Sequence, residues 1–204
     1  MKLLSFNCRG IASPKKKLAF RRLLCIERVD VIFLQETLGL AMPISHLLES
    51  MLSGWHFHAL DVNGRSGGIA MGYNSKTNKL INIWGGSGFI WADLFTYELG
   101  TEIKMINVYG PCQNRAFFWE HLLRSSLLQV NNLILGGDLN FSIGYLESWG
   151  QNTQIDSLSD FFVNVLEDHG LIDIPSARLQ PTWRNIRTGE ARLARRLDCF
   201  LLKE

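Results

Sequence analysis

The sequence of 204 residues lacks the marks of a membrane protein and of a disulfide-stapled secreted domain. It has no apolar run near the ~20 residues of a membrane-spanning helix. No leader with a long apolar core precedes Met1-Lys2-Leu3-Leu4-Ser5-Phe6, which already resembles a strand. The four cysteines, Cys8, Cys25, Cys112 and Cys199, form no CxxC pair. We therefore expect reduced thiols, an intracellular location in the cytoplasm or nucleus, and no membrane contact.

A strong excess of charge of either sign is also missing. The net charge is +2, and the 47% of hydrophobic and 20% of charged residues exclude a disordered chain. Without repeats or an evident linker, 204 residues predict a single domain. Basic residues gather at the ends, because residues 1–28 hold eight Lys or Arg and one acid, and residues 181–204 hold six and three. Basic ends suit a phosphate-rich ligand, although solvated surface is the simpler explanation of either cluster alone.

Short apolar runs alternate with a few helical patterns, which predicts two stacked sheets with helices packed outside them. Turn residues at Asn63-Gly64, Asn74-Ser75 and Gly85-Gly86 separate consecutive strands, as is typical of a meander. Ser13-Pro14 marks the entrance of the first helix. We expect strands over residues 2–7, 31–34, 55–60, 68–73, 79–84, 89–97, 103–109, 133–138 and 197–202, and helices over 15–28, 44–52, 117–128 and 156–168.

The most informative segment is Leu133-Ile134-Leu135-Gly136-Gly137-Asp138-Leu139-Asn140. Its apolar residues predict a buried strand, and its two glycines allow another backbone to approach closely. Because side chains alternate along a strand, Asp138 and Asn140 point the same way if the strand geometry continues. A carboxylate and a carboxamide at the end of a buried strand suit a chemical site. The alternative is a strand that ends in an Asx turn.

Polar residues also end other buried strands. Asn7 ends the first strand, Glu36 follows the second, Tyr109 ends the strand 103–109, and Asp198 lies inside the last apolar run. A carboxylate within an apolar strand is costly unless it is paired or bound to a metal. Most of these groups offer oxygen ligands, which suit Mg²⁺ better than zinc. With basic surroundings, they predict a phosphate-ester substrate.

Seven short motifs follow one another from residue 1 to about residue 204. None of them is specific alone, but seven in this order are. The motifs are Asn7-Cys8-Arg9-Gly10, Gln35-Glu36-Thr37, Ser66-Gly67-Gly68-Ile69-Ala70, Asn107-Val108-Tyr109-Gly110-Pro111, Gly136-Gly137-Asp138-Leu139-Asn140, Pro181-Thr182-Trp183 and Arg196-Leu197-Asp198.

This series resembles the endonuclease/exonuclease/phosphatase family, and within it the apurinic-type endonuclease domain of plant LINE-type retrotransposons. The resemblance implies an α/β fold, a four-layer α/β sandwich in which two mixed β-sheets lie face to face and are flanked by helices. It also implies a Mg²⁺-dependent phosphodiesterase that nicks DNA, with Mn²⁺ as an alternative ion. The partner would then be the phosphate backbone of DNA.

The resemblance further implies roles for individual residues. Glu36 binds the metal, with Asn7 beside it. Asp138 orients or deprotonates the attacking water, and Asn140 holds that water or a phosphate oxygen. Tyr109 contacts the scissile phosphate.

The remaining implied roles concern DNA and the general acid. Asp198 orients a catalytic histidine, and Arg9, Arg115 and Thr182 contact DNA, although a solvated loop arginine explains Arg115 equally well. A core position is the simpler explanation of the neighbouring Trp183. The basic residues of the last segment suit a polymer backbone; they are Arg184, Arg187, Arg192, Arg195 and Arg196.

The likeness breaks at the C-terminal end. The family ends in a Ser-Asp-His motif beyond the position of Asp198, and this sequence has no histidine after His169, which suits a helix C-terminus. A metal pair of His56 and His58 is a remote alternative. We therefore expect a chain that lacks the last strand or strands, with an open sheet edge available to a partner or a second copy. Loss of a positioned acid or base lowers turnover by about 10²–10⁴-fold.

Three hypotheses follow from these observations. The first is a DNA-nicking nuclease derived from a retrotransposon, weak or inactive because the terminal motif is absent. The second is a non-catalytic domain that still binds nucleic acid. The third is a phosphatase that acts on a small phosphate ester.

Overall fold

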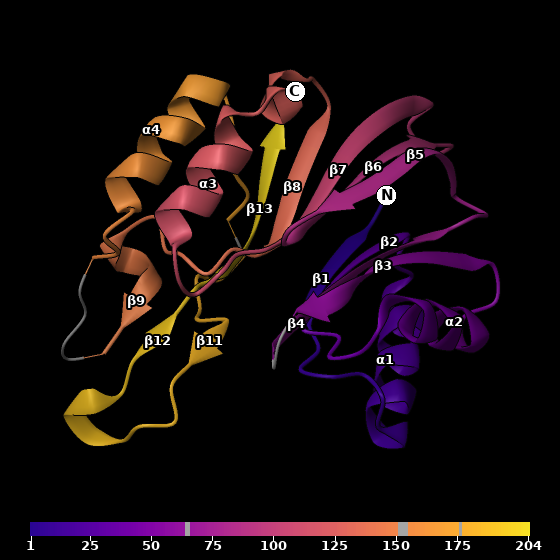
Figure 1. Cartoon of the computed structure of the whole chain (residues 1–204), viewed down its shortest axis with the longest axis horizontal. Helices are drawn as coiled ribbons and strands as arrows, with labels where there is room; N and C mark the ends of the chain where they lie inside the picture. Colours follow the sequence, from indigo (N-terminus) through magenta and orange to yellow (C-terminus); the bar gives the residue numbers. More distant parts are fainter. Residues whose placement is uncertain (64–65, 151–154, 176) are drawn as a thin grey trace. The chain divides into compact units, whose positions relative to one another are not determined.

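The structure is a computed structural model, and it describes residues 1–63, 66–150, 155–175 and 177–204. The chain divides into two compact units, which are described separately. The first unit comprises Met1–Tyr109 and Ile134–Gly137, and the second comprises Gly110–Leu133 and Asp138–Glu204 (Figure 1).

Two sheets lie face to face in the first unit. Residues of β2 alternate between them: Ile32 and Leu34 belong to the core under the helices, whereas Gln35 bonds to Asn107 of the facing sheet. The first sheet has the order β1(Leu3–Asn7), β2(Val31–Gln35), β4(Ser66–Asn74) and β3(Trp55–Asn63), with β1 parallel to β2 and the other pairs antiparallel. The part of the second sheet in this unit has the order β8(Leu133–Asp138), β7(Thr101–Tyr109), β6(Phe89–Thr96) and β5(Asn78–Gly86).

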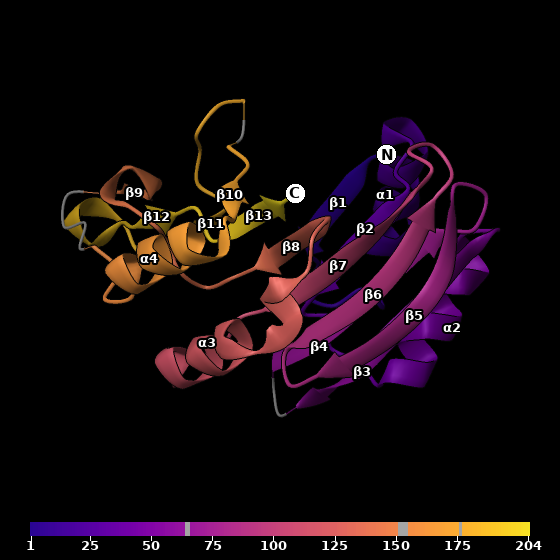
Figure 2. The ribbon, with the colours of Figure 1, turned by 90° about the horizontal axis from the view of Figure 1, so that it is seen from above.

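Helices α1(Pro14–Glu27) and α2(Ala41–Met51) cover the outer side of the first sheet (Figure 1 and Figure 2). The hydroxyl of Ser13 caps α1 by accepting a hydrogen bond from the backbone N–H of Lys16 at 3.3 Å. Helix α2 begins three residues before the predicted start at residue 44, because Pro43 lies in its first turn, where no N–H donor is needed.

Aromatic side chains form the centre of the second unit. Trp119 of α3(Arg115–Arg124) makes edge contacts with Phe141 at 5.1 Å and with Phe162 of α4(Ser159–His169) at 5.2 Å, measured between ring centroids. The prediction of one helix over 117–128 is wrong at its end, because Ser125 is extended and separates α3 from the 3-10 turn η1(Ser126–Gln129). The helical prediction from residue 156 starts too early, because Asp156 forms the turn before α4.

Strands of only two residues complete the second unit beside β13. The sequence did not predict these two-residue strands, because so short a segment shows no alternation of polar and apolar residues. β13 begins at Asp198, so this carboxylate opens the last strand and does not lie inside it. The pairs are β10(Ile172–Asp173) with β13(Asp198–Lys203), and β12(Ala194–Arg195) with β11(Trp183–Arg184) and β9(Ser148–Trp149).

The predicted fold class is confirmed, with two large mixed sheets and four α-helices in the part of the chain that the structure describes. The predicted turn at Asn74-Ser75 is confirmed after β4. The one predicted at Gly85-Gly86 is wrong by two residues, because both glycines lie in β5 and the turn is at 87–88, whereas Asn63-Gly64 falls partly outside the described residues. All four cysteines are free thiols. None of the described helices has the length and apolar character of a membrane crossing.

Candidate active site

Three predicted site residues meet at the ends of strands in the first unit. β1 and β2 run parallel with Asn7 opposite Gln35, so Asn7 and Glu36 reach the same sheet edge. The side-chain amide of Asn7 donates to Oε1 of Glu36 at 2.8 Å. The hydroxyl of Tyr109, at the end of β7, donates to the same oxygen at 3.3 Å. All three side chains are half-buried, so this cluster remains open to a ligand.

The backbone of Glu36 is held in an unusual conformation. Its φ of 53° lies in the left-handed region, which costs a non-glycine residue about 1–2 kcal/mol. Hydrogen bonds on both sides fix it: Gly10 N–H donates to the carbonyl of Glu36 at 2.7 Å, and Thr37 N–H donates to Gly68 at 3.1 Å. Strained backbone that is held by its surroundings is common at functional sites, and here it carries the central carboxylate.

A buried amide network lies directly behind this cluster. Gln35 and Asn107 are fully buried, and Nε2 of Gln35 donates to Oδ1 of Asn107 at 2.7 Å. Asn107 Nδ2 in turn donates to the carbonyls of Ala70 at 2.8 Å and Leu34 at 3.3 Å. Because Gln35 precedes Glu36 and Asn107 lies two residues before Tyr109, the network fixes both strand ends. The sequence placed both residues in motifs without a role for either; a polar residue in an apolar strand was the available signal.

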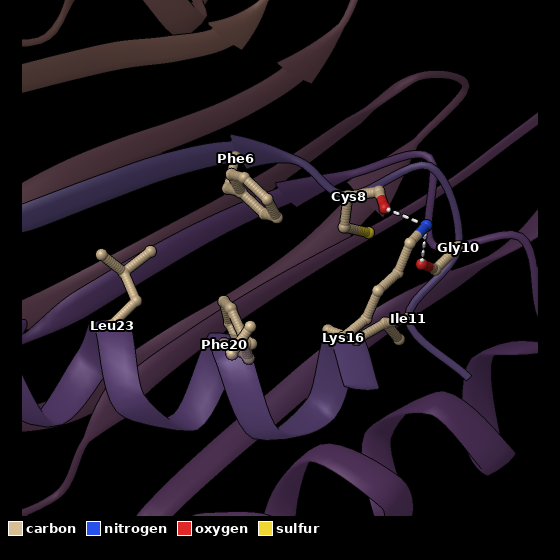
Figure 3. A pocket seen from close by; sticks show the side chains of 8 residues that line it. Phe6, Cys8, Gly10, Ile11, Lys16, Phe20 and Leu23 are labelled. Atoms are coloured by element: carbon tan, nitrogen blue, oxygen red, sulfur yellow. Dashed lines mark hydrogen bonds between the residues drawn. The ribbon is translucent and has the colours of Figure 1, made fainter. Parts of the chain in front are cut away.

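The turn after β1 is held by Lys16 of α1. Its ammonium donates to the carbonyls of Cys8, Arg9 and Gly10 at 3.1, 2.5 and 2.9 Å, and Figure 3 shows two of these bonds. The stem of Lys16 lines an apolar cavity of about 170 Å³ beside Phe20. Burial raises the pKa of the Cys8 thiol, which also lines this cavity, to about 11, so the thiol is protonated at neutral pH.

Asp138 and Asn140 form a turn in the second unit. Asn140 has a φ of 55°, so the strand geometry ends at Asp138. The N–H of Asn140 donates to Oδ1 of Asp138 at 3.3 Å, so of the two alternatives that the sequence left open, the strand ends in an Asx turn. The side-chain amide of Asn140 donates to the carbonyl of Gly110 at 2.6 Å. Asp138 is 7% exposed.

The glycine before Asp138 meets a close backbone, as the Gly-Gly pair predicted. Gly137 has a φ of 135°, and a Cβ atom there would lie 2.0 Å from the carbonyl oxygen of Val108. Only glycine therefore fits at this point of β8.

Asp198 and Thr182 lie together in the second unit. The hydroxyl of Thr182 accepts from the N–H of Leu197 at 2.9 Å and from that of Asp198 at 3.1 Å. Leu139, between Asp138 and Asn140, donates its N–H to the carbonyl of Leu197 at 2.8 Å. The turn at Asp138 and the start of β13 are thus joined.

Several arginines expected to contact DNA are paired with carboxylates in the second unit, among them Arg196, Arg115 and Arg195. Arg196 is 4% exposed and donates two bonds of 2.7 Å to the carboxylate of Asp173, with a further bond to Glu147. The bonds to Asp173 raise the pKa of the Arg196 guanidinium above its ordinary value. The expectation that Arg196 serves a polymer backbone is wrong, because its charge is neutralised in the interior. Arg115 donates to the buried Asp156 at 2.6 Å, so a DNA contact by this residue stays a prediction.

Among the residues that the structure describes, no histidine or cysteine gathers with the carboxylates of these clusters as a metal-binding group. In the described part of the chain, no three or more His, Cys, Asp or Glu side chains gather as a metal-binding group. His56 packs on Tyr73 at 5.5 Å between ring centroids, and His169 ends α4 before the left-handed cap Gly170, as predicted. Each unit thus holds a candidate cluster of its own: a half-buried carboxylate with amide and hydroxyl neighbours in the first unit, and the turn Asp138–Asn140 in the second.

A family model described as "Endonuclease/Exonuclease/phosphatase family" matches residues 4–196, and the chain belongs to this family. No curated protein sequence matches this one significantly.

Solved structures share the fold at low sequence identity. The endonuclease domain of TRAS1, a telomere-specific non-LTR retrotransposon, is 18% identical with a TM-score of 0.73, covering 99% of this chain and 84% of that one. A variant of the 3′ phosphatase NExo from Neisseria, bound to a product DNA hairpin, is 18% identical with a TM-score of 0.72, covering 98% and 85%. An AP endonuclease from Archaeoglobus fulgidus is 17% identical with a TM-score of 0.71, covering 98% and 84%.

Proposed function

We propose that this chain is a divalent-metal-dependent phosphodiesterase that nicks DNA, derived from a retrotransposon nuclease. The observation that carries the proposal is the cluster of Asn7, Glu36 and Tyr109, in which one carboxylate oxygen accepts from two neighbours at 2.8 and 3.3 Å. Family membership supports a nuclease or phosphatase. The choice of DNA draws on the TRAS1 endonuclease domain and on NExo, which was solved with a DNA hairpin.

The donor set of this cluster fits Mg²⁺ or Mn²⁺. Glu36 offers a half-exposed carboxylate, and Asn7 contributes a carboxamide beside it. Mg²⁺ is commonly bound by one or two carboxylates together with waters and substrate phosphates, and it needs no cage of several acids. When bound, the ion would polarise the phosphoryl oxygens and offset their developing charge.

The chain's own residues would orient the substrate and the water. Tyr109, whose hydroxyl now donates to Glu36, would donate to an oxygen of the scissile phosphate. Asp138 would orient or deprotonate the attacking water. Asn140 uses one amide N–H for Gly110 and would hold that water or a phosphate oxygen with its remaining groups.

The remaining assignments concern DNA and turnover. Arg9, which is exposed beside Asn7, and Thr182 would contact the DNA backbone, and Arg115 could do so after release from Asp156. Asp198 would orient a catalytic histidine, and no histidine follows it within the 204 residues. We therefore propose that the turnover rate of these 204 residues is about 10²–10⁴-fold lower than that of a site with a positioned acid.

The test is nicking of supercoiled plasmid with Mg²⁺ or Mn²⁺. We expect slow nicking that Asp138→Ala abolishes and that the exposed α4 variant Asp160→Ala leaves unchanged. Glu36→Gln should remove the rise in melting temperature on adding Mg²⁺, whereas Glu120→Gln, on an exposed position of α3, should keep it. An unchanged metal-dependent shift in Glu36→Gln would refute the metal assignment.

Other outcomes would favour the two remaining hypotheses. Salt-sensitive DNA binding without nicking at any metal concentration would indicate a non-catalytic nucleic-acid-binding domain. Release of phosphate from small esters, without any nicking, would indicate a phosphatase. The mannosyl-6-phosphatase of Bacteroides thetaiotaomicron, with a TM-score of 0.66, shares the fold and makes this arm worth including.

A further inference from the structure

Three consecutive lysines follow Pro14 in α1, and among them Lys16 folds back onto the preceding turn. Lys16 Nζ lies 3.1, 2.5 and 2.9 Å from the carbonyl oxygens of Cys8, Arg9 and Gly10. Figure 3 shows the bonds to Cys8 and Gly10. An ammonium group has three donors and no acceptor, so these three bonds use its full capacity. For Lys15 and Lys17, the described residues provide no comparable hydrogen bond.

The turn that Lys16 binds is unfavourable without such a partner. Arg9 and Gly10 both have left-handed backbone, with φ values of 43° and 81°. Left-handed conformation is strained for an arginine, and three carbonyl dipoles directed at one point repel each other. The positive charge of Lys16 offsets this repulsion and stabilises the turn.

The same turn adjoins the metal-facing groups of the proposed site, because it follows Asn7 and its backbone is bonded to Gln35 and Glu36. Cys8 N–H donates to the carbonyl of Gln35 at 2.9 Å, and Gly10 N–H donates to that of Glu36 at 2.7 Å. Asn7, the residue before the turn, donates its side-chain amide to Glu36. Lys16 therefore holds the turn on one side while the backbone of Gln35 and Glu36 holds it on the other.

We propose that Lys16 is a positioning residue, whose ammonium fixes the turn Cys8–Gly10 and so sets the Asn7–Glu36 pair in the geometry that receives the metal. This role rests on the proposed function. It differs from the one that charge alone suggests, because a lysine whose donors are all engaged by carbonyls has none left for a DNA phosphate. Lys15 and Lys17 carry the same charge on the same helix and are the matched controls.

The first measurement is the affinity of the 204-residue chain for Mn²⁺, read from the electron paramagnetic resonance of the free ion. Loss of groups that orient metal ligands typically weakens binding by about 10–100-fold. We expect Lys16→Met to weaken Mn²⁺ binding by about tenfold, and Lys15→Met and Lys17→Met to change it less than about twofold. Glu36→Gln defines full loss of the site.

The second measurement needs no metal. Hydrogen exchange in EDTA should show faster exchange of the Cys8 and Gly10 amides in Lys16→Met, by about tenfold, with unchanged exchange in the β2 core at Phe33. The salt dependence of DNA binding in EDTA should stay at the wild-type slope, whereas a lost phosphate contact would lower it by about 1.

Each result decides one statement. Wild-type Mn²⁺ affinity or wild-type amide exchange in Lys16→Met would overturn the positioning role, and a reduced salt slope with unchanged exchange would assign Lys16 to DNA instead. Equal Mn²⁺ affinity of the wild type and Glu36→Gln would overturn the proposed function itself. Weaker Mn²⁺ binding with faster exchange at the turn, in Lys16→Met alone among the three lysine variants, would support both.

Discussion

The two units fix their polar groups by opposite means. In the first unit the site carboxylate of Glu36 stays half-exposed, and the groups buried behind it, Gln35 and Asn107, are neutral amides. The second unit instead buries a charged network, in which Arg196, 4% exposed, binds Asp173 and Glu147. Neutral networks depend on geometry alone, whereas a buried ion network depends on every charge being present. The comparison predicts that single substitutions have unequal effects in the two units.

The largest effect is expected for Arg196→Met. The change leaves Asp173 and Glu147 without their shared cation, and breaking a buried ion pair from one side costs about 3–5 kcal/mol. Urea denaturation followed by tryptophan fluorescence measures the loss. Arg187→Met, at an exposed position of the same basic segment, should shift stability by less than about 0.5 kcal/mol. Equal effects of the two variants would show that the ion network does not stabilise this unit.

The next effect is a loss of stability in alkali. Burial raises the pKa of Cys8 from 9.0 to about 11, so between these values the unfolded chain loses a proton that the folded chain keeps. Stability is therefore intact below pH 9 and falls as the pH rises to about 11, by about 2–3 kcal/mol in total for this group. Urea denaturation in EDTA across this range measures it, and Cys8→Ala should flatten the decline.

The matched control for this prediction is Cys25→Ala, since Cys25 is a free and exposed thiol of the same unit. It should keep the wild-type slope. Burial also raises the pKa of Cys199 in the second unit, so a residual alkaline decline in Cys8→Ala is expected. A wild-type decline in Cys8→Ala would mean that Cys8 does not couple to folding in this range.

The sequence predicted the parts of the fold that carry a period or a cap. Ser13-Pro14 marked the start of α1, and the apolar run 133–138 marked β8 with its close-packed Gly137. The two-residue strands of the second unit carry no such signal. The break at Ser125 was missed because the apolar positions continue on both sides of it.

The site residues that a strand pattern marks were likewise predicted, and those without such a pattern were not. Polar residues at strand ends identified Asn7, Glu36 and Tyr109, because parallel and facing strands bring their ends to one edge. Alternation failed at Asn140, where a left-handed residue ends the strand and the side chain follows the turn. Composition cannot separate a lysine that binds carbonyls from one that faces solvent, so Lys16 was seen only as charge. The same limit applied to Arg196.

The smallest effect expected is in the amide network, and it tests the comparison most closely. Gln35→Met should cost about 1–2 kcal/mol, because Oδ1 of the buried Asn107 loses its partner at 2.7 Å. Asn107→Leu should lower the free energy of unfolding less in the Gln35→Met variant than in the wild type. Replacing both partners by apolar groups of similar shape leaves neither amide of this pair unsatisfied. Urea denaturation of the four proteins in this cycle gives the coupling energy. Gln35→Met combined with Asn164→Leu, an exposed position of the second unit, should instead be additive. If the stability losses of the Gln35 and Asn107 variants were additive too, the two amides would not act as a pair. The neutral network would then stabilise the strand ends only as two separate polar residues would.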